Sequence, residues 1–296
     1  MIFIRTSLLL CLLIVLILPN DAKSKIDTDD KGKLALSAPE YSGFKTHTNY
    51  MSQNSYNYEY IKDEMAARRG KFYQRFELRD GDCFGDDTWN DCENDRERVE
   101  FSSRPRQDPS GNQCFAYSIK LDKDFIDVYP TNTDLGQIHQ KGGPTGKAGG
   151  YVSLPPLIQM AAKKGKFYFK WHSLTGSPTN VKDEVIHYYL LDIKDMIEKW
   201  NDISFCLNYE DELMQVWVNG NKKHEISNSP INFIPDSTYF KYGIYRSFVS
   251  RYKNWKESIG QEAKLPTQIV YYDEIRRGNS ITEVDFNINP KLMPVD

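Results

Sequence analysis

The most regular feature of this chain is a two-residue alternation of apolar and polar side chains, which recurs in short runs from residue 71 onward. Successive side chains of a strand point to opposite faces, so this alternation is typical of strands with one buried face. Turn residues separate the runs, and Asn219-Gly220 directly follows one of them as a strong hairpin signal. The predicted strands cover residues 71–79, 98–102, 114–121, 166–171, 203–209, 213–218, 239–245 and 268–275.

Helical periodicity is scarce by comparison. Residues 191–200, which read Leu-Asp-Ile-Lys-Asp-Met-Ile-Glu-Lys-Trp, form the one convincing helical stretch. Many strands with few short helices favour an all-β fold, a sandwich of two antiparallel sheets of jelly-roll type. Residues 25–65 lack clear periodicity, and we predict an N-terminal arm there with about one strand. The sandwich domain would then span residues 66–296.

The first residues follow a different pattern. Arg5 provides a basic start, residues 8–18 form an almost unbroken apolar run, and Pro19 ends it. A basic flank before an apolar segment this short is typical of a secretory signal peptide. We therefore predict that residues 1–24 direct secretion, or export to the periplasm, and are then removed. An uncleaved N-terminal anchor is the alternative.

The composition limits the classes of binding partner that we expect for this protein. The formal net charge of −3 becomes about −4 without residues 1–24, and this balance does not favour a protein that binds nucleic acid or a membrane. An anionic ligand would need basic side chains gathered locally in a groove. The 19 tyrosines agree with a strand-rich chain and also suit sugar binding. We expect a monomer.

Four cysteines follow the apolar run. Cys83 and Cys92 close a short loop, and a disulfide between them is the first choice in an oxidising compartment. Cys114 and Cys206 lie within predicted strands, where a second bridge and a buried free thiol both fit. The spacing of cysteines and histidines is not that of a zinc site.

The first of three polar groups with chemical potential enters a predicted strand. Alternation places Arg96, Arg98 and Glu100 on one face. Two arginines on one face can form a fixed fork for a sugar carboxylate, because the planar guanidinium group matches carboxylate geometry. A solvated ladder of salt bridges is the alternative interpretation.

The second group stands at the start of a glycine-rich loop, residues 136–156. On a strand, Gln137 and His139 share a face, so an amide and an imidazole able to accept a proton would lie together. Long glycine-rich loops in β domains are often binding loops. A structural histidine and a connector without a binding role are the alternatives.

The third group lies on a late strand. Lys241, Gly243 and Tyr245 share one face, whereas Arg246 lies on the other. Gly243 leaves an opening where a ligand can approach the backbone. A lysine beside a tyrosine favours ionisation of the phenol, which would help it exchange protons. An aromatic residue that only packs in the sheet is the alternative.

Taken in order, these motifs resemble a polysaccharide lyase family that includes heparin lyase I-like and glucuronan lyase-like jelly rolls. The resemblance covers roughly residues 70–280, and it implies a concanavalin-like β-jelly-roll. Each motif is weak alone, and their ordered set is more specific for the fold than for the substrate. The motifs are Q-R-F-E-L-R at 74–79, R-E-R-V-E at 96–100, G-Q-I-H-Q at 136–140, P-P-L-I-Q-M at 155–160, W-V-N-G at 217–220, Y-F-K-Y-G-I-Y-R at 239–246 and V-Y-Y-D-E-I-R at 270–276.

The resemblance implies β-elimination at a uronic acid within an acidic polysaccharide. In such a reaction a base removes the proton at C5 and an acid protonates the departing glycosidic oxygen, while the sugar carboxylate is neutralised. By the family's pattern, His139 and Tyr245 are the base and acid candidates, in an order that depends on the epimer. The residues expected to contact the substrate are Gln137, Arg98 and Lys241, which would neutralise the carboxylate, together with Arg96 and Arg246.

Some members of the family carry a structural calcium ion. Acidic side chains between residues 80 and 87 are candidates for binding one, although their spacing is not that of a recognised calcium loop. No other cofactor is expected. These candidates are Asp80, Asp82, Asp86 and Asp87.

Two other functions fit the same fold. A glycoside hydrolase needs a pair of carboxylates, and Glu283-Val284-Asp285-Phe286 begins such a pattern, but Ile288 stands where the second glutamate belongs. A carbohydrate-binding module without catalysis is the other alternative. Glucuronan, alginate and heparin-like polymers are not distinguished by the sequence.

Overall fold

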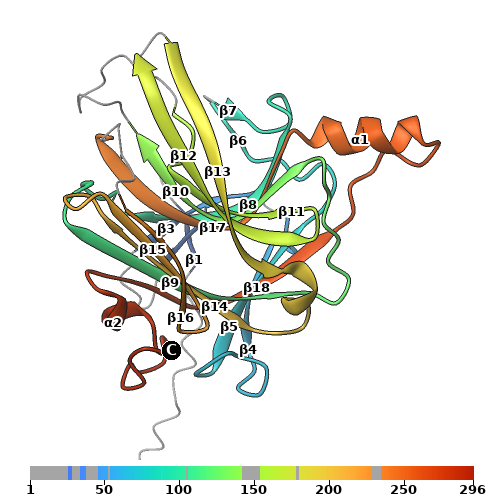
Figure 1. The fold of residues 1–296 in the computed structure, drawn as a ribbon. Helices are drawn as coiled ribbons and strands as arrows, with labels where there is room; N and C mark the ends of the chain where they lie inside the picture. The colour runs from blue at the N-terminus through green and yellow to red at the C-terminus, as the bar shows by residue number, and fades with distance from the viewer. Residues whose placement is uncertain are drawn as a thin grey trace, which may run out of the picture.

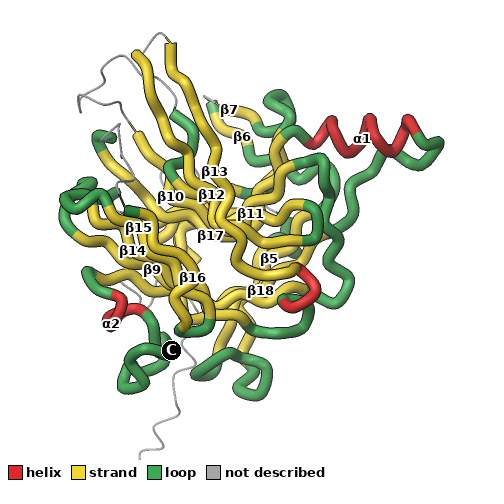
Figure 2. Tube along the Cα trace, viewed as in Figure 1, coloured by secondary structure: helices red, strands yellow, loops and turns green. Residues whose placement is uncertain are grey.

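The protein is described by a computed structural model that covers residues 26–28, 34–37, 46–52, 54–87, 89–104, 106–141, 154–177, 180–227 and 235–296. Two antiparallel sheets form a β-sandwich (Figures 1 and 2), which confirms the predicted jelly-roll class. We call them the large sheet, with nine strands, and the small sheet, with seven.

The large sheet has the order β1 (Ile26–Thr28), β2 (Leu34–Ser37), β3 (Thr46–Tyr50), β8 (Arg96–Arg104), β17 (Ser237–Ser247), β10 (Asn132–Lys141), β11 (Ile158–Lys163), β12 (Lys166–Ser177) and β13 (Asn180–Asp192). The small sheet has the order β16 (Asn221–Ile226), β15 (Leu213–Val218), β14 (Asn201–Asn208), β9 (Asn112–Leu121), β18 (Gln268–Gly278), β5 (Phe72–Leu78) and β4 (Tyr58–Lys62). A separate hairpin joins β6 (Gly85–Asp86) to β7 (Trp89–Asn90). All eight predicted strands are confirmed.

The core lies between the two sheets and is rich in aromatic rings. Phe240 of β17 packs against Phe115 of β9, with ring centroids 5.4 Å apart, and against Phe205 of β14 at 6.2 Å. Tyr272 of β18 donates hydrogen bonds of 2.8 Å to the carbonyl oxygens of Leu135 and Gly243 in the large sheet. The core side of β17 therefore carries its even-numbered residues, and its odd-numbered residues project from the opposite face.

The N-terminal segment contains more strands than its sequence predicts. Residues 46–50 form β3, which pairs with β8, and residues 58–62 form β4, which pairs with β5. Both segments are short and lack clean alternation, so their conformation follows from pairing, of β3 with the distant strand β8 and of β4 with the next strand, β5. Residues 1–25, which hold the predicted signal peptide, lie outside the described residues.

The predicted helix over residues 191–200 is wrong. Leu191 and Asp192 finish β13, where they pair with Phe167 and Lys166 of β12. Only Ile193–Asp195 form a helical turn, of the 3-10 type. The helical spacing of apolar residues there reflects a buried turn, because the side chains of Ile193 and Met196 both enter the core.

The longest helix, α1 (Val249–Ser258), was not predicted. It projects from the body of the sandwich beyond the end of β17 (Figures 1 and 2) and buries only Val249 and Tyr252. Its sequence therefore carries no wide apolar stripe. A second helix, α2 (Ile281–Val284), contacts β9, β14 and β18 of the small sheet. Within the described residues, no helix is long and apolar enough to span a bilayer.

Both pairs of cysteines form disulfides. Cys83–Cys92 is confirmed, and Cys114–Cys206 resolves the open choice in favour of a bridge. Cys114 and Cys206 are direct partners in the β9–β14 pairing, so the sheet register brings together two thiols far apart in sequence. The glycine-rich segment is shorter than expected, because residues 136–141 belong to β10; residues 142–153 lie outside the described part of the chain.

Candidate active site

A pocket of about 660 Å³ lies on the face of the large sheet that points away from the core. Strands β8, β10 and β17 supply its central residues, and the β6–β7 hairpin and residues 154–156 contribute to its wall. Six of the seven predicted catalytic and substrate-binding residues line it, namely Arg96, Arg98, Gln137, His139, Lys241 and Tyr245.

Strand register explains why these residues meet. Lys241 of β17 pairs with Gln137 of β10, and Tyr245 pairs with Arg98 of β8. Directly paired residues project from the same face of a sheet. Gly243 lies between Lys241 and Tyr245 and pairs with Glu100. A side chain at Gly243 would collide with β8, because its Cβ would lie 2.2 Å from a backbone oxygen there.

A buried carboxylate that does not itself line the pocket connects three of these residues, and the sequence analysis placed it beside the arginines without assigning it to the site. Glu100 is 1% exposed. Its carboxylate accepts a hydrogen bond from Lys241 Nζ and one of 2.5 Å from Gln137 Nε2, and Arg98 lies 3.6 Å away. Burial lowers the pKa of Lys241, whereas Glu100 acts in the opposite direction. Glu100 therefore orients all three residues predicted to neutralise the substrate.

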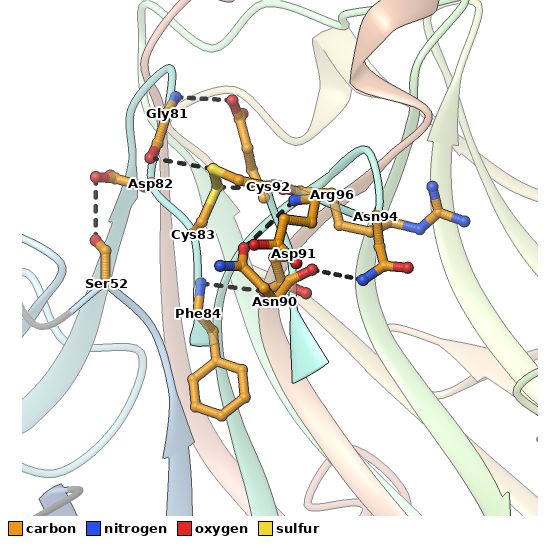
Figure 3. The surroundings of a disulfide bond; sticks show 12 residues. Ser52, Gly81, Asp82, Cys83, Phe84, Asn90, Asp91, Cys92, Asn94 and Arg96 are labelled. Carbon is orange, nitrogen blue, oxygen red and sulfur yellow. Dashed lines mark hydrogen bonds between the residues drawn. A yellow bond between two sulfur atoms is a disulfide. The ribbon is translucent and has the colours of Figure 1, made fainter. Parts of the chain in front are cut away.

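Arg98 is fixed by a second buried carboxylate, Asp91. Arg98 Nε donates to Asp91 Oδ2 at 2.6 Å, and its Nη2 donates to Oδ1 in a two-pronged ion pair. Asp91 lies inside the loop closed by Cys83 and Cys92, where it also accepts a hydrogen bond from Phe84 N (Figure 3). The disulfide loop therefore contributes both to the pocket wall and to the orientation of Arg98.

His139 is held as a neutral imidazole with one free nitrogen. Its Nδ1 lies 2.9 Å from the carbonyl oxygen of Gln140, which can only accept a hydrogen bond, so Nδ1 carries the proton and Nε2 keeps its lone pair. The ring stacks on Tyr239 at 5.2 Å. Burial lowers the pKa of His139 to about 3, and the positive charge of Lys241 adds to this effect.

Tyr245 is held in its protonated form. Burial raises its pKa to about 12, although Arg98 and Arg96 act in the opposite direction. The Arg98 guanidinium carbon lies 4.6 Å from the centre of the tyrosine ring, and Lys241 Nζ lies 5.8 Å from it. The expectation that Lys241 would promote ionisation of the phenol is therefore wrong, because desolvation outweighs the neighbouring charges. Tyr245 can donate a proton at neutral pH.

A second polar network at the pocket was missed by the sequence analysis. His172 contacts Asp183 through Nδ1 and Gln159 Oε1 through Nε2, both at 2.8 Å, and Gln159 Nε2 donates to Asp134. Lys170 lies 3.9 Å from Asp134. These residues come from four different strands, so their meeting depends on sheet register. In the sequence, the only signal for this network is the alternation that places Lys170 and His172 on the same face of β12.

Arg246 does not line the pocket, so its predicted substrate contact is not supported. Its side chain is fully buried on the core side of β17, where it donates to the carbonyl oxygens of Leu78 and Pro266 at 2.8 and 3.0 Å. Glu97 lies 3.4 Å from it. The cause is alternation itself, which places Arg246 on the face opposite Tyr245.

The acidic residues considered for calcium do not converge. Asp82 accepts hydrogen bonds from Tyr56 and Asn57, whereas Asp80 forms an ion pair of 2.9 Å with Lys253. Across the described part of the chain, no three His, Cys, Asp or Glu side chains gather as metal ligands. These residues therefore do not fit a calcium site.

Comparison with known proteins is decisive at the level of family. The model of the family described as "Polysaccharide lyase" matches residues 40–276. The chain belongs to this polysaccharide lyase family. No curated protein matches the lyase sequence. Among solved structures, the lyase is similar to an endo-β-1,4-glucuronan lyase from the fungus Trichoderma reesei, at 14% identity and a TM-score of 0.56, over 84% of this chain and 96% of that one.

A family 7 alginate lyase in complex with substrate is also similar to this lyase, at 13% identity and a TM-score of 0.50, over 85% of this chain and 94% of the other. At such identities the similarity shows the fold. The carboxylate pair considered for a hydrolase is remote from the lyase pocket. Glu283 lies in α2, and Asp285 directly follows that helix, where it accepts a hydrogen bond from Ser204.

Proposed function

We propose that this polysaccharide lyase is secreted and cleaves a uronic-acid-containing polysaccharide by β-elimination, with His139 as base and Tyr245 as acid. One observation carries the proposal. A neutral imidazole on β10 and a protonated phenol on β17 line the same pocket, and the cluster of Lys241, Arg98 and Glu100 lies beside them on β17 and β8. The similar alginate lyase was solved with a uronate substrate.

The chemistry follows from these groups. A uronate carboxylate beside Arg98, Lys241 and Gln137 has its charge partly neutralised, which makes the proton at C5 more acidic. His139 Nε2 removes that proton, and the electron pair forms a double bond between C4 and C5. The C4–O bond breaks, and Tyr245 donates its phenolic proton to the departing oxygen. Solvent then returns a proton to Tyr245 and removes one from His139.

The cations of the site are mostly paired within the protein. Glu100 holds Lys241, and Asp91 holds Arg98. The role of these carboxylates is to fix the donors in place before substrate arrives, since preorganised donors need no rearrangement during the reaction. Arg96 supplies further positive charge at the pocket.

The test is a panel of uronate polymers monitored by the ultraviolet absorbance of the unsaturated product. We expect turnover by the wild type and loss of turnover in His139→Ala and Tyr245→Phe, with the folded state intact by circular dichroism. His224, which is half-buried, and Tyr189, which is exposed, lie outside the pocket, so His224→Ala and Tyr189→Phe are matched controls. Wild-type rates in both site variants would refute the assignment, and binding without any turnover would indicate a carbohydrate-binding module.

Secretion is supported by the disulfides Cys83–Cys92 and Cys114–Cys206, because such bonds form and persist in oxidising compartments. Expression of the full chain followed by N-terminal sequencing of the exported protein tests this part of the proposal. We expect a mature chain that starts close to residue 25. Retention of the intact N-terminus in a membrane fraction would indicate an anchor instead.

A further inference from the structure

At the edge of the pocket, two arginines contact one aromatic ring. Phe248 lines the pocket and is 36% exposed. The guanidinium carbon of Arg96 lies 4.1 Å from the centre of its ring, and that of Arg251 lies 4.0 Å from it. The two positive charges are therefore at most 8.1 Å apart, the sum of these distances. We call this group the Arg96–Phe248–Arg251 stack.

The two arginines of the stack form no ion pair within the described part of the chain, and the nearby Asp95 carboxylate is hydrogen-bonded to Ser250. Arg96 donates one hydrogen bond of 2.9 Å to the carbonyl oxygen of Asp95, and neither Arg96 nor Arg251 forms an ion pair there. Arg98, by contrast, is bound by Asp91. A carboxylate ligand at the stack would thus meet two cations without first displacing a protein carboxylate.

Hydrogen bonds hold the backbone at the centre of the stack, Phe248. Phe248 adopts a left-handed conformation, with φ of 60° and ψ of 51°, which is unfavourable for a residue with a large side chain. Asp95 stabilises this turn by accepting hydrogen bonds from Phe248 N at 2.9 Å and from Ser250 N at 2.8 Å. Thr131 Oγ1 donates to the carbonyl oxygen of Phe248 at 2.9 Å. Backbone strain of this kind is often retained at functional sites.

The stack lies close to the reacting groups but is distinct from them. Phe248 follows Tyr245 by three positions, so roughly 11 Å of extended chain at most separates their α-carbons. A polymer that places one sugar at Tyr245 would extend a neighbouring sugar toward the start of α1. There, the Phe248 ring offers an apolar surface, and the guanidinium groups offer donors for a carboxylate.

We propose that the Arg96–Phe248–Arg251 stack is an outer subsite that binds the carboxylate of a uronate unit adjacent to the one that is cleaved. This inference rests on the proposed lyase function, which it extends to residues of α1. The stack would contribute to affinity for chains long enough to reach it, and its contribution would fall as salt screens the charges.

The experiment measures binding of uronate oligomers of increasing length by calorimetry, in a Tyr245→Phe background that prevents cleavage. We expect Arg251→Ala to weaken binding of long oligomers by roughly tenfold or more, with a smaller loss for shorter oligomers and at higher salt. Lys256→Ala is the matched control, because it removes a positive charge from the far end of the same helix.

An equal effect of Arg251→Ala at every oligomer length, no effect at any length, or an equal loss in Lys256→Ala would overturn the subsite. Turnover by the wild-type protein is measured in parallel and separates the two proposals. If the wild type cleaves a polyuronate but Arg251→Ala binds it normally, only the subsite fails. If the wild type neither binds nor cleaves any polyuronate, both proposals fail.

Discussion

The two disulfides should differ in what their removal does, because one closes a short loop at the candidate active site and the other joins two paired strands that are far apart in the sequence. In the chain-entropy model, a bridge stabilises the fold by restricting the unfolded chain, and the effect grows with the loop that it closes. Cys83–Cys92 spans 9 positions and Cys114–Cys206 spans 92. The corresponding contributions to the free energy of unfolding are about 2.6 and about 4.6 kcal/mol.

The effects of the two disulfides on turnover should follow the opposite order to their effects on stability. The Cys83–Cys92 loop holds Asp91, whose carboxylate fixes Arg98, and it also contributes Phe84 and Trp89 to the pocket. Cys114 and Cys206 pack beside α2, and neither lines the pocket. Small displacements of a positioned group can lower a rate by about a hundredfold. We therefore expect Cys83→Ala/Cys92→Ala to lose at least about tenfold in turnover and Cys114→Ala/Cys206→Ala to lose little.

The assay combines urea unfolding of both double variants with initial rates on the preferred polyuronate, measured where each variant is fully folded. We expect the free energy of unfolding to fall further in Cys114→Ala/Cys206→Ala, by about 2 kcal/mol more than in the other variant. Equal losses of stability would refute the argument from loop length. Full turnover in Cys83→Ala/Cys92→Ala would refute the role of the loop in orienting Arg98.

Three further perturbations test the physics of the site. Burial lowers the pKa of His139 to about 3, from an ordinary value of about 6.5. Between these two pH values the unfolded chain binds a proton at His139 and the folded protein does not. The free energy of unfolding should therefore fall as the pH is lowered from about 6.5 to about 3, and it should fall by less in His139→Gln. Glu100→Gln leaves Lys241 without its buried partner, so urea unfolding should show a loss of about 3–5 kcal/mol; a neutral result would refute the pairing. Gly243→Ala places a Cβ 2.2 Å from a backbone oxygen of β8, whereas a Cβ at Gly260 meets nothing within 4 Å. Both glycines have positive φ, so thermal unfolding should show a clearly larger loss for Gly243→Ala than for Gly260→Ala, and equal losses would exclude a steric origin.

Much of the candidate site could be predicted because alternation is a local property. The two-residue period fixed which residues of β17 share a face, so Lys241 and Tyr245 lie together in the pocket. The same rule placed Arg246 on the other face, and the structure buries it there. Its assignment to the substrate came with the family resemblance, and the structure does not support it because the side chain is buried on the core side. The hairpin at Asn219-Gly220 was equally local, and both residues adopt the positive φ that such a turn requires.

What the tertiary structure alone decided depends on contacts between distant segments. The pairing of Cys114 with Cys206, the binding of Arg98 by Asp91 and the network of His172 all require a register that no single segment encodes. Residues 191–200 failed as a helix because β12 offered backbone partners to the end of β13.

The protonation states of the site belong to the tertiary structure as well. The sequence by itself determined the class of fold, the faces of its strands and the residue types available for proton transfer. It did not determine that His139 is neutral or that Tyr245 keeps its proton, because those states follow from burial. Desolvation disfavours whichever form carries charge, and the extent of desolvation is set only when the sheets have paired and packed.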